Sequence, residues 1–272
     1  MKTLYAIPSH QCNLNCPHCT IKDSPEIFNY DKFMEQLNKF DGAIVLFGGE
    51  PAFNKERSIK IYNDNKKNGL NKIGSVSTNL LILDDVLLNI YTDIGYIATS
   101  WNMTRFSNIQ YTTWLKNCHQ ISTLGINTVV LITLTEDLIT TNGMNEFLKC
   151  ANNWDTSYFK NIQFEYYIGD HEPGYYDRVD NWLCELYKVW DNHIPINLFK
   201  SDYICYNDCS EIYTLFPDGT LLNTCPNGMY INKHVPSECL LCEKSGKCRP
   251  CILQENCSYP KKLRELIESE VK

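Results

Sequence analysis

Short runs of apolar and β-branched residues alternate with longer amphipathic stretches over residues 1–195. The short runs predict strands at about 2–8, 43–47, 72–77, 94–100, 127–134 and 161–168. The amphipathic stretches predict helices at about 30–40, 54–68, 82–92, 108–124, 143–153 and 175–192. This alternation is typical of a parallel sheet with crossover helices. Six such units are too few for a closed eight-stranded barrel, so the pattern predicts an α/β fold built as an open, partial (β/α)6 barrel.

The helical pattern stops after Pro195. The next stretch is rich in loops and cysteines, and it predicts one β-hairpin, with strands at 212–216 and 220–222 around Pro217-Asp218-Gly219. So short a segment cannot bury much core, and bound metal would have to stabilise it. We therefore expect three parts, namely a barrel at 1–195, a small loop-rich domain at 196–260 and a charged C-terminal helix at 261–272.

The composition excludes several classes of protein. The chain has 272 residues, 43% of them hydrophobic, and a formal net charge of −7, which is ordinary for a globular protein. An acidic balance with 25 Lys and Arg argues against a protein that grips nucleic acid through its phosphates. No stretch approaches the roughly 18 apolar residues of a membrane span, and the N-terminus lacks the apolar segment of a secretory signal. We expect a cytoplasmic protein with no nucleic-acid or membrane partner.

Cysteine is the unusual residue, because 14 occur in a chain long enough to bury a core without disulfides. Without a secretory signal, metal or redox chemistry explains them better than a disulfide framework does. Cys118, Cys150 and Cys184 stand alone in predicted helices, where we expect them to be small buried apolar residues. The other eleven form a group of three near the N-terminus and a group of eight near the C-terminus.

The first group, Cys12, Cys16 and Cys19, puts three thiolates on one short loop after the first predicted strand. In parallel sheets, chemistry gathers at the C-terminal ends of the strands. Three ligands would leave one iron of a four-iron cluster open to a further ligand. A zinc site is the alternative, and it would take His10 or His18 as its fourth ligand.

The spacing Cys-x3-Cys-x2-Cys after the first strand resembles the signature of the radical S-adenosylmethionine (SAM) enzymes. Gly48-Gly49-Glu50-Pro51, after the second strand, is similar to the methionine-binding motif of that family. The resemblance implies that SAM chelates the open iron through its amino and carboxylate groups. An electron from the reduced cluster would then cleave the sulfonium bond, and the resulting 5′-deoxyadenosyl radical would abstract hydrogen from a substrate.

The resemblance also implies SAM-binding roles for other strand ends. Glycines at 48 and 49 would let the backbone approach the ligand closely. Ser100 and Asn102, after the fourth strand, resemble polar groups that contact ribose or methionine. Arg105 would pair with the SAM carboxylate, although similar enzymes carry that arginine further along the chain, and a solvated loop charge is the alternative. Thr78 and Asn79 are weaker candidates, because they would serve equally well as a helix N-cap.

The second group contains eight cysteines, enough for two complete four-cysteine sites. Two zinc sites are the alternative, but the spacing C-x2-C-x5-C-x2-C is tighter than that of a usual zinc ribbon. The stretch resembles the SPASM extension of radical SAM enzymes, which carries two auxiliary four-iron clusters. The resemblance gives one cluster to Cys205, Cys209, Cys225 and Cys251, and the other to Cys239, Cys242, Cys248 and Cys257. The final gaps are shorter than usual, which leaves the pairing open. With the first group, this makes three 4Fe-4S clusters in all.

Similar SPASM proteins mostly modify peptides or proteins, so the resemblance implies that the substrate is crosslinked, epimerised or oxidised. The auxiliary clusters would transfer electrons, and a flavodoxin- or ferredoxin-type donor would reduce the enzyme. Because Met1 directly precedes the first strand, the barrel itself or a separate leader-peptide-binding protein would have to recognise a leader peptide. Sulfatase-maturing enzymes carry an aspartate after the cysteine that corresponds to Cys225, and Pro226 in this position argues against that activity.

Glu165 near the end of the sixth predicted strand, and Asp170 and His171 after it, are our candidates for proton transfer or substrate contact. A solvated loop beside core tyrosines is the alternative. A second functional hypothesis is a radical SAM dehydrogenase that acts on a small molecule of the aminocyclitol type, which the short chain favours and the two auxiliary sites do not. A third is a non-catalytic iron–sulfur or zinc protein, which would need no SAM motif.

Overall fold

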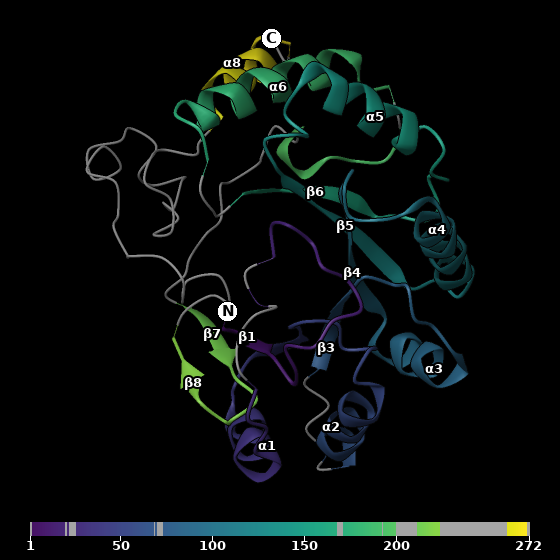
Figure 1. Cartoon of the computed structure of the whole chain (residues 1–272), viewed down its shortest axis with the longest axis vertical. Coiled ribbons are helices and arrows are strands. Elements are labelled where there is room, and N and C mark those ends of the chain that lie inside the picture. Colours follow the sequence, from purple (N-terminus) through teal and green to yellow (C-terminus); the bar gives the residue numbers. More distant parts are fainter. Residues whose placement is uncertain are drawn as a thin grey trace. The chain divides into compact units, whose positions relative to one another are not determined.

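The structure is a computed structural model, and it describes residues 2–19, 21, 26–67, 69, 73–167, 171–191, 193–199, 211–223 and 260–270. Within these residues the chain forms an open, mostly parallel sheet with the strand order β6-β5-β4-β3-β2-β1-β7-β8 (Figure 1). This confirms the predicted α/β fold with a partial barrel. The chain divides into two compact units, one made of Met1–Ser100, Thr104–Val129 and Cys209–Tyr230, the other of Trp101–Met103, Val130–Asp208 and Ile231–Lys272.

All six predicted strand and helix pairs are present in the described residues. They are β1 (Thr3–Ala6) and α1 (Tyr30–Lys39), β2 (Ala43–Leu46) and α2 (Lys55–Lys67), β3 (Ile73–Thr78) and α3 (Asp85–Ile94), β4 (Tyr96–Trp101) and α4 (Asn108–Thr123), β5 (Asn127–Leu134) and α5 (Thr141–Ala151), and β6 (Asn161–Tyr166) and α6 (Tyr175–Val189). After them come a short 3-10 helix, Asn197–Phe199, and then β7 (Ile212–Leu215), β8 (Leu221–Leu222) and α8 (Lys261–Glu270). None of the helices in the described part combines the length and the apolarity that crossing a membrane requires.

Capping residues explain where several helices begin. The Asp84 carboxylate accepts the backbone N–H groups of Val86 and Leu87 at the start of α3. Ser107 forms a capping box with Gln110 at the start of α4. Because Asp84 occupies the cap of α3, Thr78 and Asn79 are not helix caps, and the alternative that the sequence left open for them is wrong.

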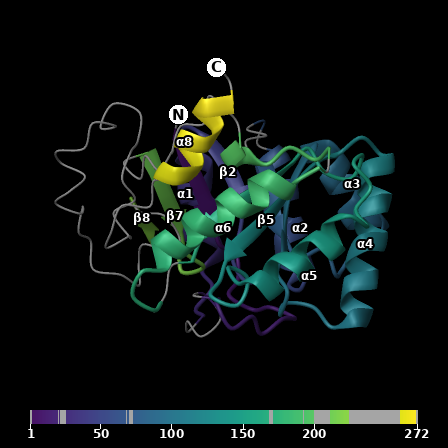
Figure 2. The ribbon, with the colours of Figure 1, turned by 90° about the horizontal axis from the view of Figure 1, so that it is seen from above.

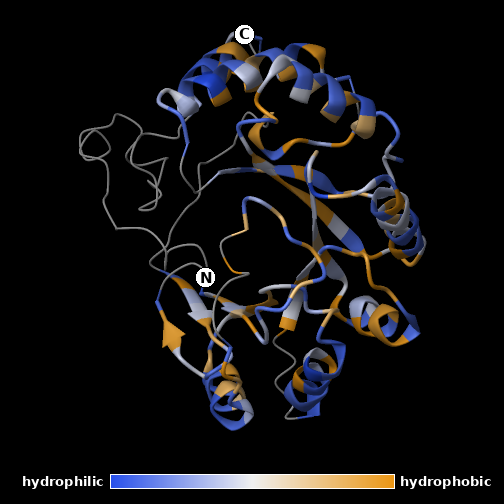
Figure 3. Ribbon diagram, viewed as in Figure 1, coloured by the Kyte–Doolittle hydropathy of each residue, from blue (hydrophilic) through white to orange (hydrophobic). Residues whose placement is uncertain are grey.

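In the first unit, alternate strand residues are buried and carry the core. Leu4, Ile44 and Ile97 are fully inaccessible, and Phe33 and Leu37 of α1 pack into the same core. Strand residues alternate between the two faces of a sheet, so burial of every second residue means that one face of each strand is covered. Figure 3 shows the result, with hydrophobic residues along the strands and hydrophilic residues over much of the helix surfaces.

The hairpin of β7 and β8 joins the sheet of the first unit. β7 pairs in parallel with β1 in the register Thr3↔Ile212 to Ala6↔Leu215, and it pairs antiparallel with β8. At the turn, a Cβ on Gly219 would lie 2.5 Å from the Cβ of Lys32 in α1. The hairpin therefore covers the free edge of β1, which would otherwise expose unpaired backbone groups. The predicted domain boundary at 195/196 stays a prediction.

An aromatic core holds the second unit together. Phe147 of α5 stacks on Trp190 and meets Trp182 of α6 and Phe164 of β6 at ring-centre distances of 5.6, 6.3 and 5.7 Å. Helix α8 lies beside α6 (Figure 2). The Asp180 carboxylate of α6 accepts the N–H groups of Lys262 and Leu263 at 2.9 and 3.0 Å, and thus caps α8 from a neighbouring helix.

Candidate active site

The three N-terminal cysteines lie on the loop that follows β1, as predicted. Cys12, Cys16 and Cys19 form no disulfide, and Cys16 is buried. The Cys12 sulfur accepts the N–H of Leu14 at 3.4 Å, and the N–H of Cys19 donates to the Cys16 carbonyl at 3.1 Å. Burial raises the pKa of the Cys12 thiol, so a nearby positive charge or metal is needed to favour the thiolate.

The donor set of this loop fits an iron–sulfur cluster, although its sulfur atoms do not converge. In the part of the chain that is described, no three His, Cys, Asp or Glu side chains lie close enough together to hold a metal ion. Three thiols within eight residues, none of them in a disulfide, nevertheless supply the type of ligand that holds such a cluster.

The Gly-Gly-Glu-Pro motif lies directly against the cysteine loop. The N–H of Gly49 donates to the Ser9 carbonyl at 3.0 Å, and the N–H of Glu50 donates to the Gln11 carbonyl at 2.8 Å. These bonds continue the β1–β2 ladder beyond the strand ends. Gly48 has φ +131°, and a Cβ on Gly49 would lie 2.1 Å from the Gln11 oxygen. The close approach that requires glycine is therefore an approach to the chain's own cysteine loop.

Glu50 is buried, with 1% of its surface exposed, and it accepts three hydrogen bonds. The donors are the N–H of Ala52 at 2.9 Å, the Thr78 hydroxyl at 2.7 Å and the N–H of Asn79 at 2.6 Å. Burial raises the pKa of this carboxyl, although the hydrogen bonds oppose the effect. Glu50 thus joins the ends of β2 and β3.

Asn79 extends this network to the cysteine loop. Its side-chain amide donates to the side-chain oxygen Oδ1 of Asn13 at 2.7 Å and lies 4.0 Å from the Cys12 sulfur. Asn13 and Asn79 therefore connect the buried Glu50 to the first predicted ligand. The sequence offered no signal for Asn13, because an asparagine between two cysteines reads as an ordinary loop residue.

Arg105 faces the same group of residues. Its positive charge acts to lower the pKa of both Glu50 and Cys12, against the larger effect of burial. The Nε atom of Arg105 is buried and has no hydrogen-bond partner among the described residues. An arginine that served only as a solvated loop charge would not have a buried Nε atom. The surroundings of Arg105 therefore suit a guanidinium that pairs with an anionic ligand.

Ser100 and Asn102 differ in their surroundings. Thr99 accepts the indole N–H of Trp114 in α4, so Ser100, its neighbour on β4, points to the face that the helix does not cover. Asn102 is buried, and its amide donates to the Thr133 carbonyl and the Thr135 hydroxyl at 3.3 and 3.2 Å. Asn102 is thus held to the end of β5.

Several strand positions outside the covered faces carry polar side chains, whereas those of β2 are Ala43 and Val45. In the first unit, Ser75, Ser77 and Ser100 are half-exposed, and in the second unit Gln163 is half-exposed and Glu165 is exposed. The interior of a closed barrel is instead packed with branched apolar side chains. A strand face lined with small polar groups is suited to a polar ligand.

Glu165 and His171 are described, whereas Asp170 lies outside the described residues. Solvent reaches the Glu165 side chain, but desolvation by the surrounding protein raises its pKa to about 7. His171 stacks on the Tyr175 ring at 4.6 Å, and the Tyr175 hydroxyl donates to the Leu134 carbonyl at 2.5 Å. Tyr175, at the start of α6, is buried, whereas the loop tyrosines Tyr166 and Tyr167 are half-buried.

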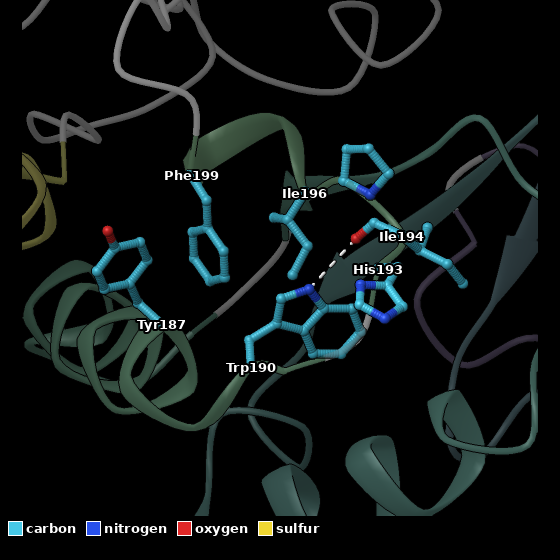
Figure 4. A pocket seen from close by; sticks show the side chains of 7 residues that line it. Tyr187, Trp190, His193, Ile194, Ile196 and Phe199 are labelled. Atoms are coloured by element: carbon cyan, nitrogen blue, oxygen red, sulfur yellow. Dashed lines mark hydrogen bonds between the residues drawn. The ribbon is translucent and has the colours of Figure 1, made fainter. Parts of the chain in front are cut away.

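A separate pocket of about 310 Å³ lies in the second unit, at the end of α6. Figure 4 shows Tyr187, Trp190 and Phe199 among its lining, with the Trp190 indole N–H donating to the Ile194 carbonyl at 3.2 Å. None of the sequence-predicted site residues lines this pocket. The eight C-terminal cysteines, from Cys205 to Cys257, all lie outside the described residues.

Comparison with known proteins identifies similar solved structures. No protein-family model and no curated protein matches the sequence. The structure of anSMEcpe with bound AdoMet has a TM-score of 0.64 at 16% identity, over 99% of this chain and 95% of that one. SuiB of Streptococcus suis has TM-scores of 0.60 bound to precursor peptide SuiA and 0.57 bound to S-adenosylmethionine, both at 12% identity over 85% of this chain. This chain spans 61% and 60% of those SuiB chains. All of these proteins are radical SAM enzymes, and the likeness is one of fold.

Proposed function

We propose that this chain, which has the fold of radical SAM enzymes, is itself a radical SAM enzyme. The contact between the cysteine loop and Gly48-Gly49-Glu50 carries the proposal, because a zinc site or an electron carrier needs no second motif built against its ligands. Two of the solved neighbours are bound to AdoMet or S-adenosylmethionine, which supports the same ligand here.

The first site would be assembled from three elements. Cys12, Cys16 and Cys19 would hold a four-iron cluster, and the Arg105 guanidinium would pair with the carboxylate of SAM. When bound, the cluster and SAM supply an electron and a 5′-deoxyadenosyl radical that abstracts hydrogen from a substrate. The backbone of Gly48, Gly49 and Pro51 would face the methionine part of SAM.

Other residues of the motif would position this site. Glu50 accepts all three of its hydrogen bonds from groups of the protein, so it would position the loop that contacts SAM and would not contact SAM itself. Ser100, on the uncovered face of β4, would contact ribose. Asn102 would act through β5, to whose end it is bonded.

The eight C-terminal cysteines would hold two auxiliary four-iron clusters in the 196–260 segment. Eleven cysteines divided as three, four and four require about twelve irons and as many sulfides per chain. Iron and sulfide analysis of anaerobically reconstituted protein tests this number. Stoichiometric zinc with little iron in protein isolated without air would contradict it.

We further propose that the substrate is a peptide or protein. The complex of SuiB with a precursor peptide supports this class, and Glu165, Asp170 and His171 would contact the substrate or move a proton. Peptides encoded beside the gene, deuterated at their α- and β-carbons, should pass deuterium into 5′-deoxyadenosine. Transfer from an aminocyclitol but from no such peptide would favour the small-molecule dehydrogenase instead.

The same assay tests the redox role of the auxiliary clusters. Cys225→Ala and Cys251→Ala should lose the same auxiliary cluster and keep the first one. Both variants should still transfer deuterium to 5′-deoxyadenosine, because hydrogen abstraction precedes the electron transfer, but they should form little oxidised product. Normal product from both variants would remove the redox role.

A further inference from the structure

A single carboxylate joins the two ends of the first cysteine loop. Glu26, which follows the loop, accepts the Ser9 hydroxyl at 2.7 Å and the backbone N–H of His10 at 3.0 Å. Ser9 and His10 precede Cys12, and the Ser9 hydroxyl also accepts the N–H of Gln11 at 3.1 Å. Glu26 therefore ties the chain that enters the loop to the chain that leaves it.

Arg57 of α2 completes this contact. Its Nη1 forms an ion pair with Glu26 and donates to the Pro8 carbonyl at 2.8 Å. The guanidinium carbon lies 4.0 Å from the centre of the Phe28 ring, within the range of a cation–π interaction. One side chain thus holds Pro8, before the cysteines, and both Glu26 and Phe28, after them.

The pair is protected from solvent. The side chains of Arg57 and Glu26 are 22% and 14% exposed, whereas those of Lys66 of α2 and Asp93 of α3, which also form an ion pair, are 49% and 38% exposed. Burial alone would raise the pKa of Glu26, but the hydrogen bonds from Arg57, Ser9 and His10 outweigh it and hold the pKa below its usual value. Removing either partner would leave an uncompensated charge in a poorly hydrated place.

We propose that Glu26 and Arg57 form a clasp that joins the two ends of the cysteine loop in the metal-free chain. The role of the loop rests on the proposed function, but the clasp is a property of the chain alone. A loop closed at both ends has less conformational entropy to lose when its thiols converge on a cluster. Glu26 and Arg57 are positioning residues, because they act through Pro8, Ser9 and His10.

Amide exchange in the metal-free, full-length chain tests the clasp directly. The N–H of His10 donates to Glu26, so Glu26→Gln and Arg57→Met should each exchange this amide at least about tenfold faster than the parent. The double variant should exchange little faster than either single variant, because both changes remove the same interaction. The control, Lys66→Met, removes an exposed ion pair between α2 and α3 and should leave the exchange of His10 unchanged.

A second variant keeps the test decisive if Arg57→Met unfolds the chain. Protection of Cys118, which is buried in α4, from alkylation reports whether a variant is folded. Arg57→Lys keeps the charge but loses the planar guanidinium that lies over the Phe28 ring, so it should speed His10 exchange by a smaller factor than Glu26→Gln does. Parental exchange in both Arg57→Lys and Glu26→Gln would overturn the clasp.

SAM binding to the reconstituted chain separates the clasp from the proposed function. The electron paramagnetic resonance signal of the reduced first cluster should change on adding SAM, and Glu26→Gln should need at least about tenfold more SAM for the same change. A parent that builds no cluster on Cys12, Cys16 and Cys19 would contradict the proposed function, and the exchange data would still decide the clasp. If the parent builds its first cluster and responds to SAM, and if Glu26→Gln and Arg57→Lys match the parent in SAM response and in His10 amide exchange, the clasp alone would be contradicted.

Discussion

Gly49→Ala places one methyl group between the two motifs of the candidate site. The added Cβ would lie 2.1 Å from the carbonyl oxygen of Gln11 and 2.5 Å from that of His10. Carbon and oxygen atoms normally approach no closer than about 3.3 Å, so the cysteine loop would have to move by about 1 Å. That movement would also strain the bonds from Gly49 to Ser9 and from Glu50 to Gln11.

The expected cost follows from these contacts. Overpacking costs about 1–3 kcal/mol, and two strained backbone hydrogen bonds add about 1 kcal/mol each, so Gly49→Ala should lower the free energy of unfolding by about 3 kcal/mol or more. A loop shifted by about 1 Å should also weaken SAM binding at least about tenfold.

Gly95→Ala is the matched control for this substitution. Gly95 has φ +73° but no atom within 4 Å of an added Cβ, so this variant carries backbone strain of about 1–2 kcal/mol without a steric clash. Urea denaturation and equilibrium SAM binding measure both effects. If Gly49→Ala were no less stable than Gly95→Ala and bound SAM like the parent, the close packing of the two motifs would be refuted.

Three further substitutions test other parts of the structure. Glu50→Gln places a buried amide against three hydrogen-bond donors and should lower the free energy of unfolding, measured in urea, by about 1–3 kcal/mol. The control at an exposed position, Glu35→Gln, should change it by less than about 0.5 kcal/mol. Equal losses in the two variants would contradict the buried network. Asp180→Ala removes the cap of α8, so it should lower the free energy of unfolding by about 1–2 kcal/mol and speed amide exchange at the start of that helix. The control is Asn181→Ala. Unchanged amide exchange in Asp180→Ala would count against the cap. Because the folded-state pKa of Glu165 is raised to about 7, the folded chain binds more protons than the unfolded chain between about pH 4.5 and 7, so stability falls across that window. Glu165→Gln should show less of this fall, and a Glu165 carboxyl that titrates below pH 5 by carbon NMR would refute the shift.

Local patterns in the sequence predicted the elements well because their causes are local. Alternating burial in β1 to β6 and the amphipathic spacing of residues such as Phe33 and Leu37 are visible without the fold. Strand β5 has its predicted bounds, whereas β1 and β2 came out shorter and end at Ala6 and Leu46, because backbone pairing ends before the apolar run does. The cysteine loop and Gly48-Gly49 were predicted from motif and position together.

Contacts between residues that are far apart in the sequence could not be predicted. The hairpin was predicted, but its pairing with β1 joins residues near 213 to residues near 4, and no local pattern specifies such a partner. Glu26 and Arg57 likewise read as ordinary loop and helix charges, since only the fold brings α2 beside both ends of the cysteine loop. The sequence also predicted only part of the role of Glu50, because its three hydrogen-bond donors belong to two segments that are far apart in the sequence, one at Ala52 and one at Thr78 and Asn79.

Reductive cleavage of SAM tests the central claim most directly. Anaerobically reconstituted, reduced protein should release methionine and 5′-deoxyadenosine from SAM, slowly even without a substrate. The triple variant Cys12→Ala, Cys16→Ala, Cys19→Ala should release neither, and it should keep about eight of about twelve irons on the auxiliary cysteines. Undiminished cleavage by the triple variant, or no cleavage by a parent chain with its full iron content, would contradict the assignment of this loop as the SAM-cleaving site.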